Sequence, residues 1–285
     1  MKVIGVIVTY NSNFEKLSAI FNVLKRDADL LVSDNSTSVE HSQKIKALCD
    51  ENNVHYISMN GNVGIARAQN EGIKAALDMS FEDILLLDDD SLPHADMIDV
   101  LFRTRESTAA RVNKLPVVCA NPCDSEGHSV AKYGKKIADS VYICRDITSS
   151  GTLINKKHFD IVGLHEEKLF IDCVDFEWGW RAKSKDIFII LSQEAILSHQ
   201  LGDGKINVIN ARSGSPIRHY YQFRNILYMC TRNYTPFSWK ASQAFKLIIK
   251  YFILIPCCFD NKITRFKFAS KGIKDFLLGR YGSIN

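Results

Sequence analysis

The first 120 residues alternate short apolar runs with stretches of helical periodicity, and this alternation leaves few folds open to the chain. Between the runs, apolar side chains recur every three or four residues, the spacing of a helix with one buried face. The runs typical of buried strands are Val3 to Thr9, Asp29 to Ser33, Val54 to Ser58, Asp83 to Leu87 and Val117 to Ala120. Strands that alternate with helices predict an α/β fold with a Rossmann-like, mostly parallel sheet flanked by helices. Such sheets bind ligands at the carboxyl ends of their strands.

From about residue 121 the pattern becomes less regular. The expected elements are, in order, a hairpin or loop over 127–142, a strand or turn that lines a site over 147–154 and contains Ser149-Ser150-Gly151, a helix over 175–185 and a strand over 187–191. Pro93 is expected in the first turn of a helix, where its missing N–H costs little. The break signal Ser213-Gly214-Ser215-Pro216 predicts a boundary between a domain of residues 1–212 and a helical extension of residues 213–285.

Charge is unevenly distributed along the chain, although the net charge is only +4. The segment from Lys205 onward carries 14 Lys or Arg and two acids, whereas residues 1–204 carry 22 basic and 30 acidic side chains. A basic tail on an acidic body suggests that the tail faces an anionic partner. Nucleic acid is a poor candidate, because the basic residues match no recognised module and the acidic body would repel a phosphate backbone.

The tail also has an amphipathic pattern. One helical stripe contains Phe245, Ile248, Ile249, Phe252 and Ile255, and lysines lie off the stripe. Basic amphipathic helices lie on anionic membrane surfaces, so a membrane contact through the extension is one interpretation. The alternative is a helical pair that packs on the domain with a solvated basic face. The two interpretations are compatible.

The cysteines and apolar segments point to a cytoplasmic protein. The eight cysteines include no CxxC pair and no zinc-like spacing, which favours reduced structural thiols. The apolar run that follows Met1-Lys2 is too short for a signal peptide. The longest uncharged apolar stretch near the C-terminus, Tyr251 to Phe259, is too short to span a bilayer.

Four polar clusters fall where strands of the predicted sheet should end. They are Thr9-Tyr10-Asn11, Asp34-Asn35-Ser36, Asn60 to Gly64, and the aspartate triplet Asp88-Asp89-Asp90. Each cluster alone could be a turn or a helix cap, but four at one sheet edge favour a binding site. Three adjacent carboxylates at a core boundary repel one another unless a cation neutralises them, and hard oxygen ligands suit Mg²⁺ or Mn²⁺. The alternative is that Asp90 or Ser91 simply caps the following helix.

Two further features bear on chemistry. Asp175 is expected at the start of a helix within the acidic segment Asp172 to Trp178, where its carboxylate could act as a general base or as a helix cap. His199 follows a strand and is either structural or part of a metal shell. The sequence contains neither GxxxxGK[ST] nor a GxGxxG motif after the first strand, so a diphosphate would be held through metal and side chains.

In this order, the clusters resemble the inverting family-2 glycosyltransferases of GT-A fold. The resemblance covers about residues 3–235 and extends to the rhamnosyltransferase branch of that family. The matching pieces are Val8 to Asn11, Asp34 to Ser36, Asn62 to Ala66 with Asn70 and Gly72, Leu87 to Ser91, Phe170 to Trp178 with Arg181, Ser198 to Asp203, and Tyr220 to Asn225.

The resemblance implies a role for each candidate residue. Thr9, Asn11 and Asp34 would hold the base and ribose of a nucleotide, and Arg67 would reach the base or phosphates. Asp88 would touch the ribose or sugar, Asp90 would ligate Mn²⁺ or Mg²⁺, and His199 would assist the metal or the diphosphate. Asp175 would be the catalytic base, with Asp172 and Glu177 as rivals because relatives often carry Glu-Asp where this chain has Val174-Asp175. Substrate-binding roles are also expected for Asn62, Asp172, Glu177 and Trp178.

The expected activity is transfer of a sugar, with inversion, from a nucleoside-diphosphate donor to a glycan acceptor. Residues 1–120 would form the nucleotide-sugar half and residues 121–212 the acceptor half. The first choice is L-rhamnose from dTDP-rhamnose, with a lipid-linked acceptor, in assembly of a bacterial O-antigen or capsule. A galactofuranosyl, galactosyl or glucosyl transfer from a UDP-sugar is an alternative, and a non-catalytic nucleotide- or carbohydrate-binding module is an alternative of another class. The expected location is the cytoplasmic face of the inner membrane, as a peripheral protein.

Overall fold

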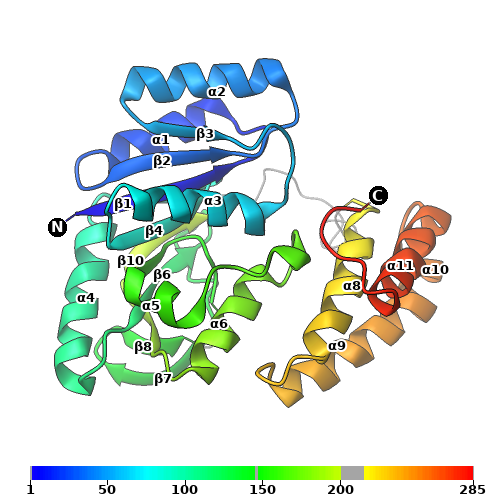
Figure 1. Cartoon of the computed structure of the whole chain (residues 1–285). Coiled ribbons are helices and arrows are strands. Elements are labelled where there is room, and N and C mark those ends of the chain that lie inside the picture. The colour runs from blue at the N-terminus through cyan, green and yellow to red at the C-terminus, as the bar shows by residue number, and fades with distance from the viewer. Residues whose placement is uncertain (1, 145–146, 200–214, 285) are drawn as a thin grey trace.

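The computed structural model describes residues 2–144, 147–199 and 215–284 (Figure 1). In this part of the chain, one 10-stranded sheet has the order β3-β2-β1-β4-β9-β6-β10-β8-β7, with β5 paired to β10. The strands are β1 (Val3–Thr9), β2 (Asp29–Asp34), β3 (His55–Ser58), β4 (Asp83–Asp88), β5 (Ser91–Pro93), β6 (Val117–Cys123), β7 (Tyr133–Ala138), β8 (Val141–Cys144), β9 (Thr152–Asn155) and β10 (Ile189–His199).

The N-terminal half of the sheet is parallel, as the sequence predicts. Strands β1, β2, β3 and β4 pair in parallel register, and their carboxyl ends therefore meet at one edge. The helices that connect the strands of the first half and lead on to β6 are α1 (Phe14–Leu24), α2 (Val39–Asn52), α3 (Ile65–Asp78) and α4 (Met97–Val112). Local capping fixes two of them: the Asn13 side chain accepts from Lys16 N at 3.1 Å, and Ser38 accepts from His41 N at 3.3 Å.

The strands of the second half depart from the simple parallel pattern. β9 lies between β4 and β6 and runs antiparallel to both. β7 and β8 form the predicted hairpin, and β8 pairs antiparallel with β10. The placement of Pro93 in a helix was wrong: Pro93 ends the short strand β5 opposite Leu197, and α4 begins only at Met97. Proline is tolerated there because the end of a short strand does not need its missing N–H.

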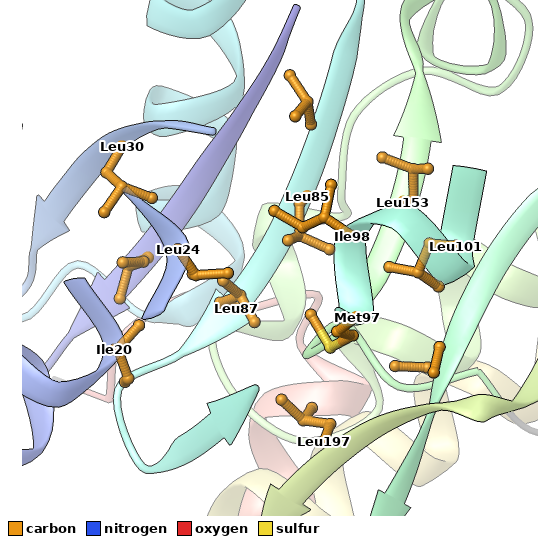
Figure 2. Close-up of a cluster of buried hydrophobic side chains, with 14 of the residues drawn as sticks. Ile20, Leu24, Leu30, Leu85, Leu87, Met97, Ile98, Leu101, Leu153 and Leu197 are labelled. Atoms are coloured by element: carbon orange, nitrogen blue, oxygen red, sulfur yellow. The ribbon is translucent and has the colours of Figure 1, made fainter. Parts of the chain in front are cut away.

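Helices cover both faces of the sheet and bury two apolar layers. Along β4, Leu85 and Leu87 face α1 and α4, whereas Ile84 and Leu86 face α3 and the later helices α5 (Lys156–Val162) and α6 (Val174–Ser184). Figure 2 shows the first layer, in which the β4 leucines lie between side chains of α1 and α4. A strand buried on both faces explains the continuous apolar run that ends in the aspartate triplet.

The C-terminal extension is helical, as predicted. It contains α8 (Arg218–Cys230), α9 (Phe237–Ile249), the π-helical segment η2 (Lys250–Leu254), α10 (Ile255–Cys257) and α11 (Lys262–Leu277). In Figure 1, α8 and α9 are drawn on the side toward α6, and α10 and α11 lie beyond α8. The predicted boundary at residue 212 lies outside the described residues. Among the described helices, none is long and apolar enough to cross a membrane.

Buried hydrogen bonds fasten the extension to the segment that precedes α6. Arg224 of α8 donates from Nη2 to the carbonyl oxygens of Lys168 and Leu169, both at 3.0 Å. Asn225 Nδ2 donates to the carbonyl of Ile171 at 2.6 Å. Both α8 side chains are fully buried, so these bonds also satisfy groups that water cannot reach. The extension therefore sets the path of the chain that enters α6.

Candidate active site

Asp88, at the carboxyl end of β4, lines two adjoining hollows. The first, here called the Asn62 cleft, has a volume of about 630 Å³ and is lined by residues that include Asn35, Asn62, the aspartate triplet, Phe170 and Arg218. The second, the Asp175 pocket, has a volume of about 350 Å³ and is lined by residues that include Asp88, Ser91, Ser150, Asp175 and Phe176. A group bound in one hollow therefore meets a group bound in the other beside Asp88.

The electrostatics of Asp88 follow from the carboxylates around it. Burial raises the pKa of Asp88 to about 8, and Asp175, Asp90 and Asp89 raise it in the same direction. The Asp88 backbone N–H donates to Ser150 Oγ at 3.1 Å, which positions the strand end. Four carboxyl groups thus meet at the junction of the two hollows, and a bound cation would relieve the repulsion that helps to keep Asp88 protonated.

Asp89, the member of the triplet for which the sequence predicts no role, holds the turn after β1. Its Oδ2 accepts a hydrogen bond from the backbone N–H of Tyr10 at 3.0 Å and another from the hydroxyl of Ser12. Tyr10 in turn lines the Asn62 cleft. Asp89 therefore ties the turn after β1 to the end of β4.

Asp90 does not cap the following helix, so that alternative interpretation was wrong. The N-cap of α4 is Asp96, whereas Asp90 Oδ1 accepts from Ser91 Oγ at 3.1 Å. Across the described residues, no group of three or more His, Cys, Asp and Glu side chains is arranged to hold a metal ion. His199 ends β10 with its backbone opposite Ser91, and its side chain lies outside the described part of the chain.

Thr9 and Asp34 lie beneath the cleft rather than on its wall. Both are fully buried, and Thr9 Oγ1 donates to Asp34 Oδ1 at 2.9 Å. Asp34 also accepts from the side chains of Ser36 (2.6 Å), Tyr56 (2.9 Å) and Ser42. Although burial raises the pKa of Asp34, these hydrogen bonds bring it below the ordinary value, so the group is an ionised carboxylate that the fold already satisfies.

Asn35 and Asn62 line the cleft, whereas Asp34, the residue expected to hold the nucleotide, does not. Asn35 Nδ2 donates to Asn62 Oδ1 at 3.1 Å, and Asn35 Oδ1 accepts from Val63 N at 2.7 Å. Asn62 Oδ1 also accepts from Gly64 N at 3.0 Å. Gly64 is required here, because its φ is +88° and an added Cβ would lie 2.5 Å from the Phe170 ring. The Asn35 side chain joins the end of β2 to the start of α3.

Of the other nucleotide candidates, neither Asn11 nor Arg67 lines the Asn62 cleft. Asn11 is exposed, and its N–H donates to Ser36 Oγ at 3.0 Å. Arg67 is an exposed residue of α3 that does not line the Asn62 cleft. Among the residues that the structure describes, Arg218 is the one cation that lines it. Sequence reasoning missed Arg218, although it lies two residues before the matched piece Tyr220 to Asn225.

Asp175, in the first turn of α6, faces Asp88 across the Asp175 pocket. Its Oδ1 accepts a hydrogen bond from the hydroxyl of Ser149, a buried residue in the loop before β9. Burial raises the pKa of Asp175, and Ser149 partly offsets this effect. In the segment that was predicted to line a site, Ser149 therefore bonds the Asp175 carboxylate, whereas Ser150 accepts from the backbone N–H of Asp88.

The remaining candidates near Asp175 take structural positions. Asp172 forms an ion pair with Arg218 at 2.7 Å. Glu177 is buried and paired with Arg181, with Nε–Oε1 at 2.8 Å. Trp178 is buried in the core and its indole N–H donates to Gly163 O at 2.9 Å. We therefore leave Glu177 and Trp178 out of the binding site.

Comparison with known proteins identifies the family. The sequence model of Glycosyl transferase family 2 matches residues 6–163. The chain is 31% identical over 244 residues to the dTDP-rhamnosyl transferase RfbF of Shigella flexneri, with 81% of each chain covered. It is 26% identical over 238 residues to the low-salt glycan biosynthesis hexosyltransferase Agl10 of Haloferax volcanii, with 77% of this chain and 72% of that protein covered.

Solved structures agree on the fold. The crystal structure of Staphylococcus aureus TarS 1–349 in complex with UDP-GlcNAc superposes with a TM-score of 0.57 at 14% identity, over 99% of this chain and 93% of that chain. A structure of GalNAc-T7 with UDP, GalNAc and Mn²⁺ gives a TM-score of 0.58 at 13% identity, over 87% of this chain and 56% of that one. The predicted fold class is confirmed, and the protein is an enzyme of GT-A fold that belongs to glycosyl transferase family 2.

Proposed function

We propose that the protein transfers a sugar, with inversion, from a nucleoside diphosphate to a hydroxyl of a glycan acceptor. The observation that carries the proposal is the junction at Asp88, where the Asn62 cleft adjoins the pocket that holds Asp175. A donor in the cleft would present its anomeric carbon beside the carboxylate that faces the acceptor. Asp175 is half-buried, ionisable and hydrogen-bonded to Ser149, as a general base should be.

Each step has a residue of this chain in a defined role. Asn35, Asn62 and Phe170 would line the nucleotide, and Arg218 would neutralise phosphate charge. The acceptor oxygen forms a bond to the anomeric carbon while the bond from that carbon to the phosphate oxygen breaks. The acceptor proton passes to Asp175, and the nucleoside diphosphate leaves with the electron pair. Attack from the face opposite the leaving group inverts the configuration.

A divalent cation fits the carboxylate chemistry of the triplet, although no group of three or more His, Cys, Asp and Glu side chains among the described residues is arranged to hold one. Asp90, with Asp88 beside it, would hold Mn²⁺ or Mg²⁺ and leave positions for phosphate oxygens. When bound, the cation supplies charge neutralisation for the departing diphosphate. The His199 side chain is retained as a candidate ligand from the sequence.

For the donor we propose dTDP-rhamnose, since the dTDP-rhamnosyl transferase of Shigella flexneri is similar over most of both chains. UDP-galactose, UDP-galactofuranose and UDP-glucose are the alternatives. The acceptor is proposed to be a lipid-linked glycan of a bacterial surface polysaccharide such as an O-antigen or capsule. The basic extension would then hold the enzyme on the cytoplasmic face of the inner membrane, with no nucleic acid involved.

A two-stage experiment tests the proposal. Thermal-shift measurements with dTDP-rhamnose and the three UDP-sugars, each with Mn²⁺ or Mg²⁺, should show stabilisation by one donor only. Transfer or donor hydrolysis with that sugar nucleotide should be lost with EDTA, in Asp90→Ala and in Asp175→Asn. Activity unchanged by EDTA and by Asp90→Ala would remove the metal from the proposal. Turnover near wild type in Asp175→Asn would place the base elsewhere, with Asp172 next to be tested.

A further inference from the structure

A third hollow lies between the catalytic part and the C-terminal extension. This Lys250 cleft has a volume of about 780 Å³, and its walls come from α6, α8 and α9 together with residues near each. Phe176 and Lys132 line both this cleft and the Asp175 pocket. The three hollows therefore form a continuous series, from the Asn62 cleft past Asp88 and Asp175 to the extension.

The charge of the Lys250 cleft is strongly positive. Four lysines line it, namely Lys132, Lys183, Lys246 and Lys250, whereas its one acidic residue, Asp172, is already paired with Arg218. Lys132 and Lys246 form no ion pair within residues 2–144, 147–199 and 215–284. A concave surface with several unneutralised ammonium groups attracts an anion.

Of the two lysines that the extension contributes to the cleft, Lys250 is half-buried and Lys246 is exposed. The Nζ of Lys250 donates to Gln222 Oε1 at 2.8 Å, which directs the ammonium group toward the α8 wall of the cleft. Burial lowers the pKa of Lys250, and among nearby charges Arg218 and Arg265 lower it further whereas Asp172 raises it. An incoming anion would reduce the repulsion among these cations.

The cleft also has an aromatic wall. The rings of Phe176 and Trp180 stack with centroids 5.5 Å apart, and Trp239 of α9 meets Trp180 edge-on at 4.9 Å. Aromatic rings of this kind offer apolar faces to the C–H groups of sugar rings or to a hydrocarbon chain, while an indole N–H can bond a hydroxyl. The wall joins the catalytic part to the extension, because Phe176 and Trp180 belong to α6.

We propose that the Lys250 cleft binds a phosphate or diphosphate group on the acceptor, with Lys246 and Lys250 as the principal contacts and the aromatic wall beside the adjoining sugar or chain. This inference rests on the proposed function, because it places the acceptor on the side of Asp175 opposite the donor. The extension then has a role in acceptor recognition. Charge-assisted hydrogen bonds from two lysines would give the site its preference for a phosphorylated acceptor over a neutral one.

The test uses the full chain and soluble probes. Binding of geranyl diphosphate, geraniol and inorganic pyrophosphate is followed by tryptophan fluorescence, in the presence of a saturating nucleoside diphosphate and Mg²⁺ that occupies the Asn62 cleft. Two of the three tryptophans, Trp180 and Trp239, line the cleft, so occupancy should change the signal. The variant is Lys246→Gln with Lys250→Gln. The matched control is Lys262→Gln with Lys267→Gln, which removes the same charge from exposed positions of α11.

Geranyl diphosphate should bind, geraniol should not, and the double variant should weaken diphosphate binding by about tenfold or more while the control changes it less than about twofold. Pyrophosphate binding as tight as that of geranyl diphosphate would assign recognition to the anion alone, and weaker binding would assign it to the prenyl-linked form. Equal diphosphate binding by both variants would overturn the inference, as would geraniol binding as tightly as its diphosphate. Absence of nucleoside diphosphate binding in every protein would instead contradict the proposed function.

Discussion

Asp89 illustrates how one carboxylate in a crowded acidic cluster can be structural. Both of its described hydrogen bonds, from Tyr10 N and from the Ser12 hydroxyl, reach the same oxygen, Oδ2. Burial raises the pKa of Asp89, whereas these two donors lower it. The carboxylate thus gains its partners within the fold, whereas Asp88 and Asp90 are the members of the triplet that we propose for donor and metal binding. Asp89 differs from its two neighbours because Tyr10 and Ser12 donate hydrogen bonds to it.

We expect Asp89→Ala to weaken nucleoside diphosphate binding by roughly five- to thirtyfold, because about 1–2 kcal/mol of turn anchoring next to Tyr10 is lost. Isothermal titration calorimetry would measure the affinity. Asp89→Asn should have a smaller effect, since its amide oxygen can still accept both bonds. Asp139→Ala in the exposed turn after β7 is the control. An Asp89→Ala affinity equal to that of the control would contradict the anchoring role.

Ser149 should set the acidic limb of the pH profile. Its hydroxyl donates to Asp175 and so stabilises the ionised base. Removing that donor in Ser149→Ala should raise the pKa of Asp175, because burial would then act with less opposition. Since the base must be deprotonated to accept a proton, the acidic limb of kcat should move to higher pH. Steady-state rates from pH 4 to pH 9 would show the direction, and an unmoved limb would argue that Asp175 does not titrate in catalysis.

At the scale of elements, helix α6 joins Asp175, the proposed base, to the extension. Glu177 Oε1 accepts from Arg181 Nε at 2.8 Å and from the hydroxyl of Tyr234 at 2.6 Å, and Tyr234 lies in the turn between α8 and α9. Arg181 Nη2 also donates to Leu164 O at 2.7 Å. The buried pair of Glu177 and Arg181, with these added bonds, fixes α6 to the turn that holds Tyr234 and to the loop that holds Leu164.

Glu177→Ala should therefore destabilise the protein by about 3–5 kcal/mol, because the half-buried Arg181 would keep its charge without a partner. Urea unfolding would measure the change in the free energy of unfolding. Tyr234→Phe removes one hydrogen bond from the same carboxylate and should cost only about 1 kcal/mol. Similar losses in the free energy of unfolding for Glu177→Ala and Tyr234→Phe would mean that the carbonyl groups of Val162 and Leu164 are sufficient partners for the Arg181 charge.

Element-level prediction succeeded where one physical rule governs the pattern. Apolar runs bounded by turn residues located β1, β2 and β4, and the polar clusters after them do meet at one sheet edge. Prediction failed where pairing partners are distant in the sequence. Nothing local indicates that β9 enters between β4 and β6, or that Pro93 pairs with Leu197 in a short strand.

Prediction of the site residues also depended on whether a local rule or a distant contact decides the position. Asp175 and Glu177 are two residues apart on a helix, a rotation of about 200°, so both could not face one pocket. That rule was available from the sequence and would have removed Glu177 as a rival base. By contrast, the burial of Asp34 under four donors depends on Ser42 and Tyr56, which come from other elements. Arg218 likewise reaches Asp172 only through the placement of α8.

At the scale of the whole molecule, the apolar stripe of the C-terminal extension is partly buried and partly exposed to solvent. Ile255 is buried within the extension, and Leu247 packs beside it. Three stripe residues instead point to solvent: Phe245 is 63% exposed, Ile248 57% and Phe252 69%. Packing within the extension therefore accounts for part of the stripe and leaves an apolar patch of these three residues. Lys246 and Lys250, on the same stretch, line the adjoining cleft.

An apolar patch beside lysines has the composition of a surface that enters the headgroup region of an anionic bilayer. We expect the triple substitution Phe245→Ser, Ile248→Ser and Phe252→Ser to reduce co-sedimentation with vesicles containing phosphatidylglycerol by about tenfold or more, since each exposed side chain contributes about 1–2 kcal/mol of burial. Ile161→Ser is the matched control, because Ile161 is 50% exposed on α5, away from the extension.

The triple variant should keep its fold, because all three side chains are more than half exposed, and its affinity for nucleoside diphosphate should be unchanged. Transfer to a water-soluble acceptor should therefore persist while transfer to an acceptor embedded in vesicles falls. High salt should weaken vesicle binding of the parent protein through the lysines but leave the contribution of the apolar patch. Undiminished vesicle binding by the triple variant would show that the patch does not enter the bilayer and that the extension serves acceptor binding alone.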